Sequence, residues 1–448
     1  MLSDPIVALA TPPGRGALAL IRLSGRGAFD LAARVLQPFH LDQPRKVFRA
    51  RVHHPQSHEP IDDALAVCFP GPSSYTGEDM VEISTHGGLL VPAEVVAGFV
   101  AAGARPAYPG EFSRRAVLNG KMDLLQAEAT ADLIDAGAPA QRRRALQQLD
   151  RGLSGRLEAL RGEILELEAL IAYDIDFPEE DEGPVSPERV ARAWRHARDR
   201  IARLLDTAPE GERLHDGALV VIAGPPNAGK SSLFNALLGK ERAIVTEIPG
   251  TTRDAIEAHA VIEGFPFRLV DTAGLRDSDD RVEKIGIEVS RKYLGAADLV
   301  LYCEECVVRG AWFAPERSEF LSAVKVPVVF VQTKADLVPS DKAGTIRVSA
   351  VTGEGLAEVK RRLAQEAFGR LVGLGDVEPV VTRARHRAAL ERALAELDSF
   401  HAAREQEVDA AAAATHLRAA VGALDDLIGV VTPEDVLDLV FASFCVGK

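Results

Sequence analysis

The chain of 448 residues carries 52 basic and 66 acidic residues, so its formal net charge is −14. A chain of this length is too long for one hydrophobic core, and we expect two to three domains. The acidic balance excludes a general electrostatic attraction for nucleic acid, so any RNA contact must use local patches. Four scattered cysteines indicate a reduced compartment, and no signal peptide or long apolar run is seen, so we expect a soluble cytoplasmic protein.

Residues 1–118 alternate short apolar runs with glycine- and proline-rich turns. Helical runs intervene near 27–36 and 91–102. This pattern predicts an N-terminal α+β domain with its own core.

Residues 119–216 and 372–448 are predicted to be mainly helical. Leucine and isoleucine recur at spacings of three and four from Leu146 to Ile171, which predicts one long amphipathic helix. Further helices are expected at 187–205, 382–405 and 410–429. We expect the two segments to pack together as one discontinuous helical domain. Residues 217–371 would then form an inserted domain whose ends lie close together.

The inserted segment begins with a phosphate-loop motif. Gly224-Pro-Pro-Asn-Ala-Gly-Lys-Ser231 matches G-x-x-x-x-G-K-[ST], between an apolar run and a helical one. Backbone N–H groups of such a loop point at phosphates, Lys230 would lie along the β- and γ-phosphates, and Ser231 would hold Mg²⁺. Strands expected at 218–223, 266–270, 298–303, 326–331 and 345–348 predict a mostly parallel sheet covered on both faces. The loop residues expected to bind the nucleotide are Asn227, Ala228, Gly229, Lys230, Ser231 and Ser232.

Four further nucleotide signals follow in a fixed order. Thr251 and Thr252 can close on Mg²⁺ and the γ-phosphate, and Asp271 can hold the water shell of the metal. Asp336 can accept two N–H donors from guanine, and the backbone after the next strand can meet the guanine carbonyl. The order resembles that of translation-factor-type GTPases and predicts GTP binding and hydrolysis. The residues expected at these positions are Thr251, Asp271, Thr272, Ala273, Gly274, Thr333, Lys334, Asp336, Ser349, Ala350 and Val351.

Two positions depart from that pattern. Thr333 stands where asparagine is usual, and a hydroxyl offers less to the base. Leu275 stands where Ras-like enzymes place the glutamine that orients the attacking water. Hydrolysis therefore needs another orienting group and another cation. The pair Cys303 and Cys306 has C-x-x-C spacing, but no second pair or nearby histidine completes a zinc site.

Taken whole, the chain resembles the MnmE (TrmE) family of bacterial tRNA-modification GTPases. The likeness covers nearly all of the chain, including the terminal Cys445-Val-Gly-Lys448, where the family has Cys-Ile-Gly-Lys. The matching segments are 6–16, 21–25, 75–82, 86–88, 109–115, 118–124, 126–135 and 445–448.

The resemblance implies a homodimer formed through the N-terminal domain, which would bind a formyl- or methylene-tetrahydrofolate. With MnmG, an FAD-dependent partner in a heterotetramer, the protein would add an aminomethyl-type group to C5 of the tRNA wobble uridine. Folate contacts carry over to Arg22, Glu82, Lys121 and Lys448, because cations suit the glutamate tail and a carboxylate suits the pterin donors. The alternative is ordinary surface charge.

In the G domain the resemblance implies K⁺ in place of an arginine finger. Asn227, Thr246, Ile248 and Thr251 occupy the positions that hold it. The catalytic glutamate of the family falls on Glu283, whose alternative role is a helix-start carboxylate.

A cysteine that the family requires for modification falls on Cys445, whose alternative role is a small buried hydrophobe. Three other functions stay open: a ribosome-assembly GTPase, a folate-dependent transfer enzyme with a regulatory G domain, and a nucleotide-gated scaffold.

Overall fold

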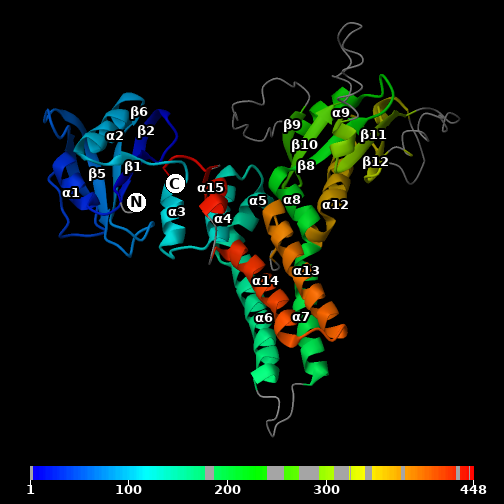
Figure 1. Cartoon of the computed structure of the whole chain (residues 1–448). Coiled ribbons are helices and arrows are strands. Elements are labelled where there is room, and N and C mark those ends of the chain that lie inside the picture. Colours follow the sequence, from blue (N-terminus) through cyan, green and yellow to red (C-terminus); the bar gives the residue numbers. More distant parts are fainter. Residues whose placement is uncertain are drawn as a thin grey trace. The chain divides into compact units, whose positions relative to one another are not determined.

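The computed structural model describes residues 4–176, 186–239, 257–271, 292–306, 322, 324–338, 346–374, 379–429, 434–442 and 444–447. Contacts divide the chain into two compact units (Figure 1). Unit 1 joins residues 1–131 to residues 425–448, and unit 2 comprises residues 132–424.

Unit 1 is built on a mainly antiparallel sheet with the strand order β3-β4-β5-β6-β2-β1-β7. Helices α1 (Ala28–Val35) and α2 (Leu90–Ala102) pack against it, and their buried faces share one apolar core with the sheet. The α+β architecture predicted for the N-terminal part is confirmed. The strands are β1 (Ile6–Leu9), β2 (Gly14–Ser24), β3 (Leu36–Gln37), β4 (Phe48–His53), β5 (Pro60–Phe69), β6 (Met80–Gly88) and β7 (Arg105–Pro106).

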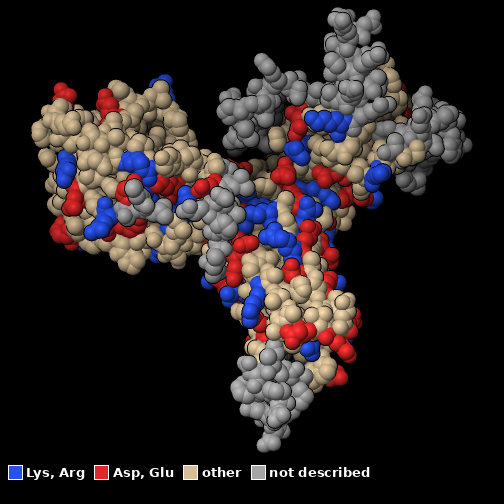
Figure 2. All heavy atoms as spheres, in the orientation of Figure 1, with Lys and Arg blue, Asp and Glu red and all other residues tan. Residues whose placement is uncertain are grey.

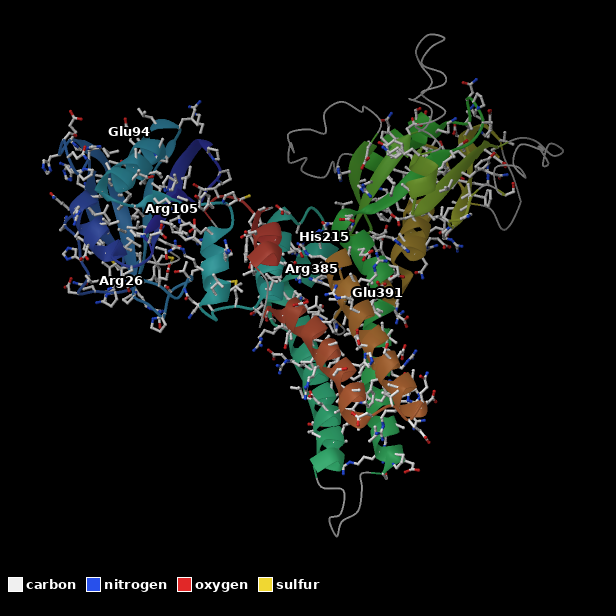
Figure 3. The ribbon with its side chains drawn as sticks, in the orientation of Figure 1. Arg26, Glu94, Arg105, His215, Arg385 and Glu391 are labelled. Atoms are coloured by element: carbon white, nitrogen blue, oxygen red, sulfur yellow. The ribbon has the colours of Figure 1, made fainter. Side chains whose placement is uncertain are left out.

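A buried arginine ties the start of the chain to helix α3 (Glu111–Leu118). The side chain of Arg115 is 1% exposed, and it pairs with Asp4 at 3.0 Å, Glu78 at 3.2 Å and Glu111 at 2.9 Å. Arg105, labelled in Figure 3, pairs with Asp4 and Glu111 as well. These five side chains form one network of opposite charges, in which each of the three carboxylates is paired with at least one guanidinium.

The last helix of the chain completes unit 1. Helix α15 (Glu434–Ala442) packs on α3, and Phe441 and Phe444 share an apolar cluster with Leu124, which begins α4 (Leu124–Asp135). A Cβ added to Gly110 would lie 2.8 Å from the Phe441 carbonyl oxygen, so this close approach requires glycine. The terminal segment is thereby held against α3 and the first residue of α4.

Unit 2 contains the sheet that carries the phosphate loop. Its strand order is β13-β12-β11-β8-β10-β9, and the neighbouring strands are parallel except for the β9–β10 hairpin. Helices α9 (Lys230–Leu238) and α12 (Leu356–Leu374) pack against it, which confirms the predicted mostly parallel sheet. The strands are β8 (Ala218–Ala223), β9 (Glu257–Ile262), β10 (Phe265–Asp271), β11 (Leu299–Glu305), β12 (Val328–Thr333) and β13 (Ile346–Arg347).

The helices before and after this sheet pack together, as the sequence predicts. Figure 1 shows α6 (Gly152–Asp176), α7 (Pro187–Leu205), α13 (Ala384–Glu405) and α14 (Ala410–Ile428) side by side. The Trp194 indole donates a hydrogen bond to the Leu397 carbonyl at 2.8 Å and stacks on His401. Arg198 of α7 also pairs with Asp398 of α13 at 2.7 Å. Helix α8 (Ala208–Asp216) leads from the bundle into β8.

The single long helix predicted through Leu146 and Ile171 is wrong. Helix α5 (Pro139–Leu149) ends at Leu149, and α6 begins at Gly152. Between them Arg151 adopts φ 62°, a left-handed conformation that a continuing right-handed helix excludes. The apolar spacing continues across the break, so periodicity alone could not show it.

Basic and acidic side chains are interleaved over the face shown in Figure 2. Within the helices that the structure describes, no stretch combines the length and apolar character needed to cross a bilayer.

Candidate functional site

The phosphate loop joins the buried strand β8 to helix α9. A Cβ added to Gly224 would lie 2.1 Å from the Cys303 carbonyl oxygen, and Gly229 adopts φ 77°, so both positions require glycine. Asn227 adopts φ 59° and is exposed, while Ala228 is 1% exposed. The loop therefore has the shape of an anion cradle at a helix N-terminus, with Asn227 on its open side.

The loop lysine lies back across the cradle. The Nζ atom of Lys230 donates hydrogen bonds to the carbonyl oxygens of Pro225 at 2.8 Å and Gly224 at 3.1 Å. Lys230 as a whole is 7% exposed. A bound phosphate would offer the same ammonium a charged acceptor in place of two carbonyls. Ser231 and Ser232 are exposed in the first turn of α9, where a hydroxyl can reach a metal ion.

Asp271 ends β10 next to the loop, because β10 and β8 are parallel neighbours and Asp271 pairs with Ile222. Burial raises the pKa of the Cys303 thiol to about 12, with Lys230 lowering it and Asp271 raising it. Lys230 and Asp271 therefore both lie near this thiol. The raised pKa keeps Cys303 protonated, which disfavours metal or redox use of the Cys303–Cys306 pair.

Thr333 reaches the phosphate loop from the end of β12. Its Oγ1 donates to the Ala228 carbonyl at 2.6 Å in a buried hydrogen bond. The structure thus joins two residues that the sequence assigned separately to the phosphates and the base.

The segments predicted to recognise the base lie at the same edge of the sheet. Lys334 adopts φ 55° and pairs with Glu305 at 2.9 Å, and Asp336 is exposed in the following turn. The Ser349 Oγ accepts the backbone N–H groups of Val351 at 3.2 Å and Thr352 at 3.1 Å. The exposed Asp336 carboxylate can accept two N–H donors from a planar base.

The segment after β13 is linked to that turn through the backbone. The Ala335 N–H donates to the Val348 carbonyl at 3.2 Å, and the buried Ser349 precedes Ala350. The two segments expected to contact guanine are therefore held together.

Several predicted site residues lie outside the described residues, so their positions stay predictions. They are Thr246, Ile248, Thr251, Thr252, Thr272, Ala273, Gly274, Glu283 and Lys448.

A second candidate site lies in unit 1 around Arg22. The guanidinium pairs with Glu82 at 2.8 Å, lies 5.2 Å from the Tyr75 ring centre, and donates to the Gly447 carbonyl at 3.4 Å. Arg22 and Glu82 are 21% and 24% exposed, so both remain reachable. The predicted pair is therefore brought together. Sequence reasoning missed Tyr75 as a neighbour, although it stands in the matching segment 75–82.

Two further predicted residues belong to unit 1. Lys121 donates from Nζ to the Pro72 carbonyl at 2.9 Å. Cys445 is exposed, which disagrees with a purely packing role for its thiol. Its carbonyl accepts the Gly110 N–H at 3.3 Å, so the backbone of the tail is fixed while the side chain is open to solvent.

Known proteins match the chain along its whole length. The family model of the MnmE helical domain matches residues 124–445, and that of the GTP-binding protein TrmE N-terminus matches residues 5–121. The chain is 40% identical over 467 residues to the tRNA modification GTPase MnmE of Moorella thermoacetica, and 44% identical over 457 residues to that of Methylobacterium sp. (strain 4-46). Both alignments span 100% of each chain. A solved G domain of the T. maritima FeoB iron transporter is similar over 34% of this chain and 98% of its own, with 30% identity and a TM-score of 0.25.

Proposed function

The chain belongs to the MnmE family of tRNA modification GTPases, and on that premise we propose that its GTP hydrolysis is stimulated by K⁺ and drives modification of the tRNA wobble uridine. In this proposal a tetrahydrofolate supplies the one-carbon unit, and an FAD-dependent MnmG partner acts in the same complex. The observation that carries it is the phosphate loop with Asn227 on its open side, in a chain matched end to end by these relatives.

The proposed K⁺ site rests on the loop asparagine. The exposed Asn227 carries an amide oxygen within the phosphate loop, and oxygen donors suit a hard cation. Thr246, Ile248 and Thr251 would supply the remaining oxygens. Leu275 cannot orient water, and Glu283 would take that role. Ser231 and Thr252 would hold Mg²⁺, and Asp271 would hold the water shell of the ion, which would neutralise charge on the phosphates.

The proposed folate site rests on the group around Arg22. Arg22 and Glu82 offer a cation and a carboxylate at one place, and the Tyr75 ring provides a flat apolar surface. Lys121 and Lys448 would add cations for an acidic tail. Cys445 would lie beside the reacting carbon.

The proposed homodimer has support in the exposed leucines of unit 1. Leu18 is 70% and Leu65 is 51% exposed. Leu18 pairs with His86, and Leu65 pairs with Ser84, so both leucines lie on one face of the sheet in neighbouring rows. Exposed apolar side chains gathered on a sheet face favour a protein partner, and we assign a second copy of this chain. We place the complex with MnmG, a heterotetramer, in the cytoplasm.

The test is mass spectrometry of wobble nucleosides from cells that lack the protein and are complemented with variants. We expect the aminomethyl-type group to be lost without the protein and restored by the natural chain. Cys445→Ser should fail to restore it, whereas Val446→Ala, a change at the neighbouring exposed position, should restore it. Unchanged nucleosides in the deletion strain would favour a ribosome-assembly GTPase. Full activity of Cys445→Ser would assign the chemistry to the partner and leave this chain as a nucleotide-gated scaffold.

A further inference from the structure

A pocket of about 270 Å³ lies in the helical part of unit 2 and is lined by three arginines. About 10–15 Å³ of such space is enough for one water molecule, so this pocket has room for a ligand of several atoms. Arg156 comes from α6, and Arg200 and Arg203 come from α7. No described acidic side chain lines it. We name it the arginine pocket.

The pocket follows from the register of α7. Arg200, Arg203 and Leu204 are separated by three residues and one residue, so they project from one face at the end of the helix, and Thr207 follows at the start of α8. The Thr207 hydroxyl is engaged by the fold, because it donates to the Leu204 carbonyl at 2.7 Å and accepts the Val381 N–H at 3.0 Å. The polar groups left to meet a ligand are therefore the guanidinium groups.

The adjacent face of α6 supplies the opposite wall. Arg156 and Leu160 are four residues apart and lie on one face of that helix. Leu160 is fully buried and Arg156 is exposed, so an apolar floor lies beneath an accessible charge. Charge interactions above an apolar floor are screened less than at an open surface.

The charges of the arginine pocket are only partly compensated by the described residues. Arg200 forms an ion pair with Glu163, and its side chain is 19% exposed. Within the described ranges, no carboxylate lies in ion-pair contact with Arg156 or Arg203. Like charges that line one pocket repel one another, so an anionic ligand would remove an unfavourable electrostatic interaction.

The chemistry of the lining selects the ligand class. Guanidinium groups present planar forks of N–H donors that match phosphate oxygens, and they keep their charge at any physiological pH. In a chain of net charge −14, a local group of arginines is what nucleic-acid binding would require. We propose that the arginine pocket binds a backbone phosphate of the tRNA. The choice of tRNA as the source of that phosphate rests on the proposed function.

The test compares tRNA binding by the full chain and its variants over a range of salt concentrations. Arg156→Gln and Arg203→Gln remove the charge but keep a polar side chain with the same first three carbon atoms. Each should weaken tRNA binding roughly tenfold at low salt and make the slope of log affinity against log salt shallower by about one.

The matched control is Arg195→Gln. Arg195 is exposed on the same helix, but it lies about 140° around the axis from Arg200, because five residues separate them. The Arg195→Gln variant should bind tRNA with the same affinity as the natural chain. Equal losses for Arg195→Gln and Arg203→Gln would overturn the proposal, since a general charge effect would then explain both.

Two further measurements distinguish the alternatives. Thermal unfolding tests whether Arg203 only stabilises the fold. Lower stability of Arg203→Gln with unchanged tRNA affinity would overturn the proposal. Calorimetry with inorganic phosphate tests a small ligand, and phosphate binding without any effect of the variants on tRNA would overturn the tRNA assignment. Loss of tRNA binding in Arg203→Gln would support the pocket even if wobble nucleosides proved independent of this protein.

Discussion

The Oγ1 atom of Thr333 lies 2.6 Å from the carbonyl oxygen of Ala228, and this buried hydrogen bond joins the end of β12 to the phosphate loop. The same hydroxyl lies 3.1 Å from the Glu304 carbonyl. A hydroxyl carries one hydrogen, so it donates to one carbonyl at a time, and the shorter distance favours Ala228. The threonine that stands in place of the usual asparagine therefore fixes the loop.

We expect Thr333→Val to weaken GTP binding by about 1–3 kcal/mol, because the buried Ala228 carbonyl would lose its donor without a change of side-chain shape. Thr333→Ser is the control, since it keeps the hydroxyl. Thr333→Asn should strengthen binding by about 1 kcal/mol if its amide reaches the base as well as Ala228. Calorimetric titration with GTP measures all three, and equal affinity of the Val and Ser variants would contradict the assigned role.

For K⁺, we expect GTP hydrolysis to be much faster in potassium than in sodium salts. Asn227→Ala should remove the difference, but Asn227 has φ 59°, which asparagine tolerates better than alanine. Asn227→Gly therefore serves as a second variant that removes the side chain without backbone strain. Turnover measured in matched KCl and NaCl decides the matter, and equal rates for the natural chain would rule out the cation site.

The exposed carboxylate of Asp336 should determine the choice of base. Asp336→Asn should shift the preference from GTP toward xanthosine triphosphate, because an amide NH₂ meets the xanthine carbonyl that a carboxylate repels. Competition between the two nucleotides for the natural and variant proteins measures the shift. An unchanged preference would mean that the backbone near Ala350 reads the base by itself.

Arg115 should be important for the stability of unit 1. Arg115→Met keeps much of the side-chain volume but leaves the carboxylates of Asp4, Glu78 and Glu111 without this partner, so we expect a loss of about 3–5 kcal/mol. Arg26→Met, at an exposed arginine of the same unit (Figure 3), should unfold like the natural chain. Urea unfolding followed by circular dichroism compares them, and similar curves would show that the network adds no net stability.

The same network predicts sensitivity to acid. A hydrogen bond from Arg105 lowers the pKa of the Asp4 carboxyl below its ordinary 3.8. Burial raises the pKa of Glu111, but hydrogen bonds from Arg105, the Tyr108 N–H and Arg115 outweigh it, and the pKa lies below 4.5.

Because both pKa values are lower in the folded state, the stability they contribute is present above about pH 4.5 and is lost as the pH falls through the folded values. Arg105→Gln should raise the pH at which unit 1 unfolds, as followed by circular dichroism during acid titration. An acid midpoint equal to that of the natural chain would show that Arg105 does not set it.

The sequence predicts the local features of this molecule and the packing of its two helical segments, but it misses other contacts between distant residues. The phosphate loop and β8 were predictable, because a motif and a continuous apolar run lie within a few residues of each other. The break at Arg151 was not, since a left-handed arginine leaves no mark in the apolar spacing. The bond between Thr333 and Ala228 was also unpredictable, because it depends on parallel strands bringing distant residues to one edge.

The docking of Phe441 and Phe444 in unit 1 also affects the order in which the chain folds during synthesis. Residues 1–131 leave the ribosome about 300 residues before the helix that completes their apolar cluster. At roughly 5–20 residues per second, translation of the intervening segment takes roughly 15–60 s. During that interval the surface around Leu124 has no α15 to cover it. We therefore expect unit 1 to reach its final form after unit 2 has been synthesised, and nascent chains to depend on chaperones until then.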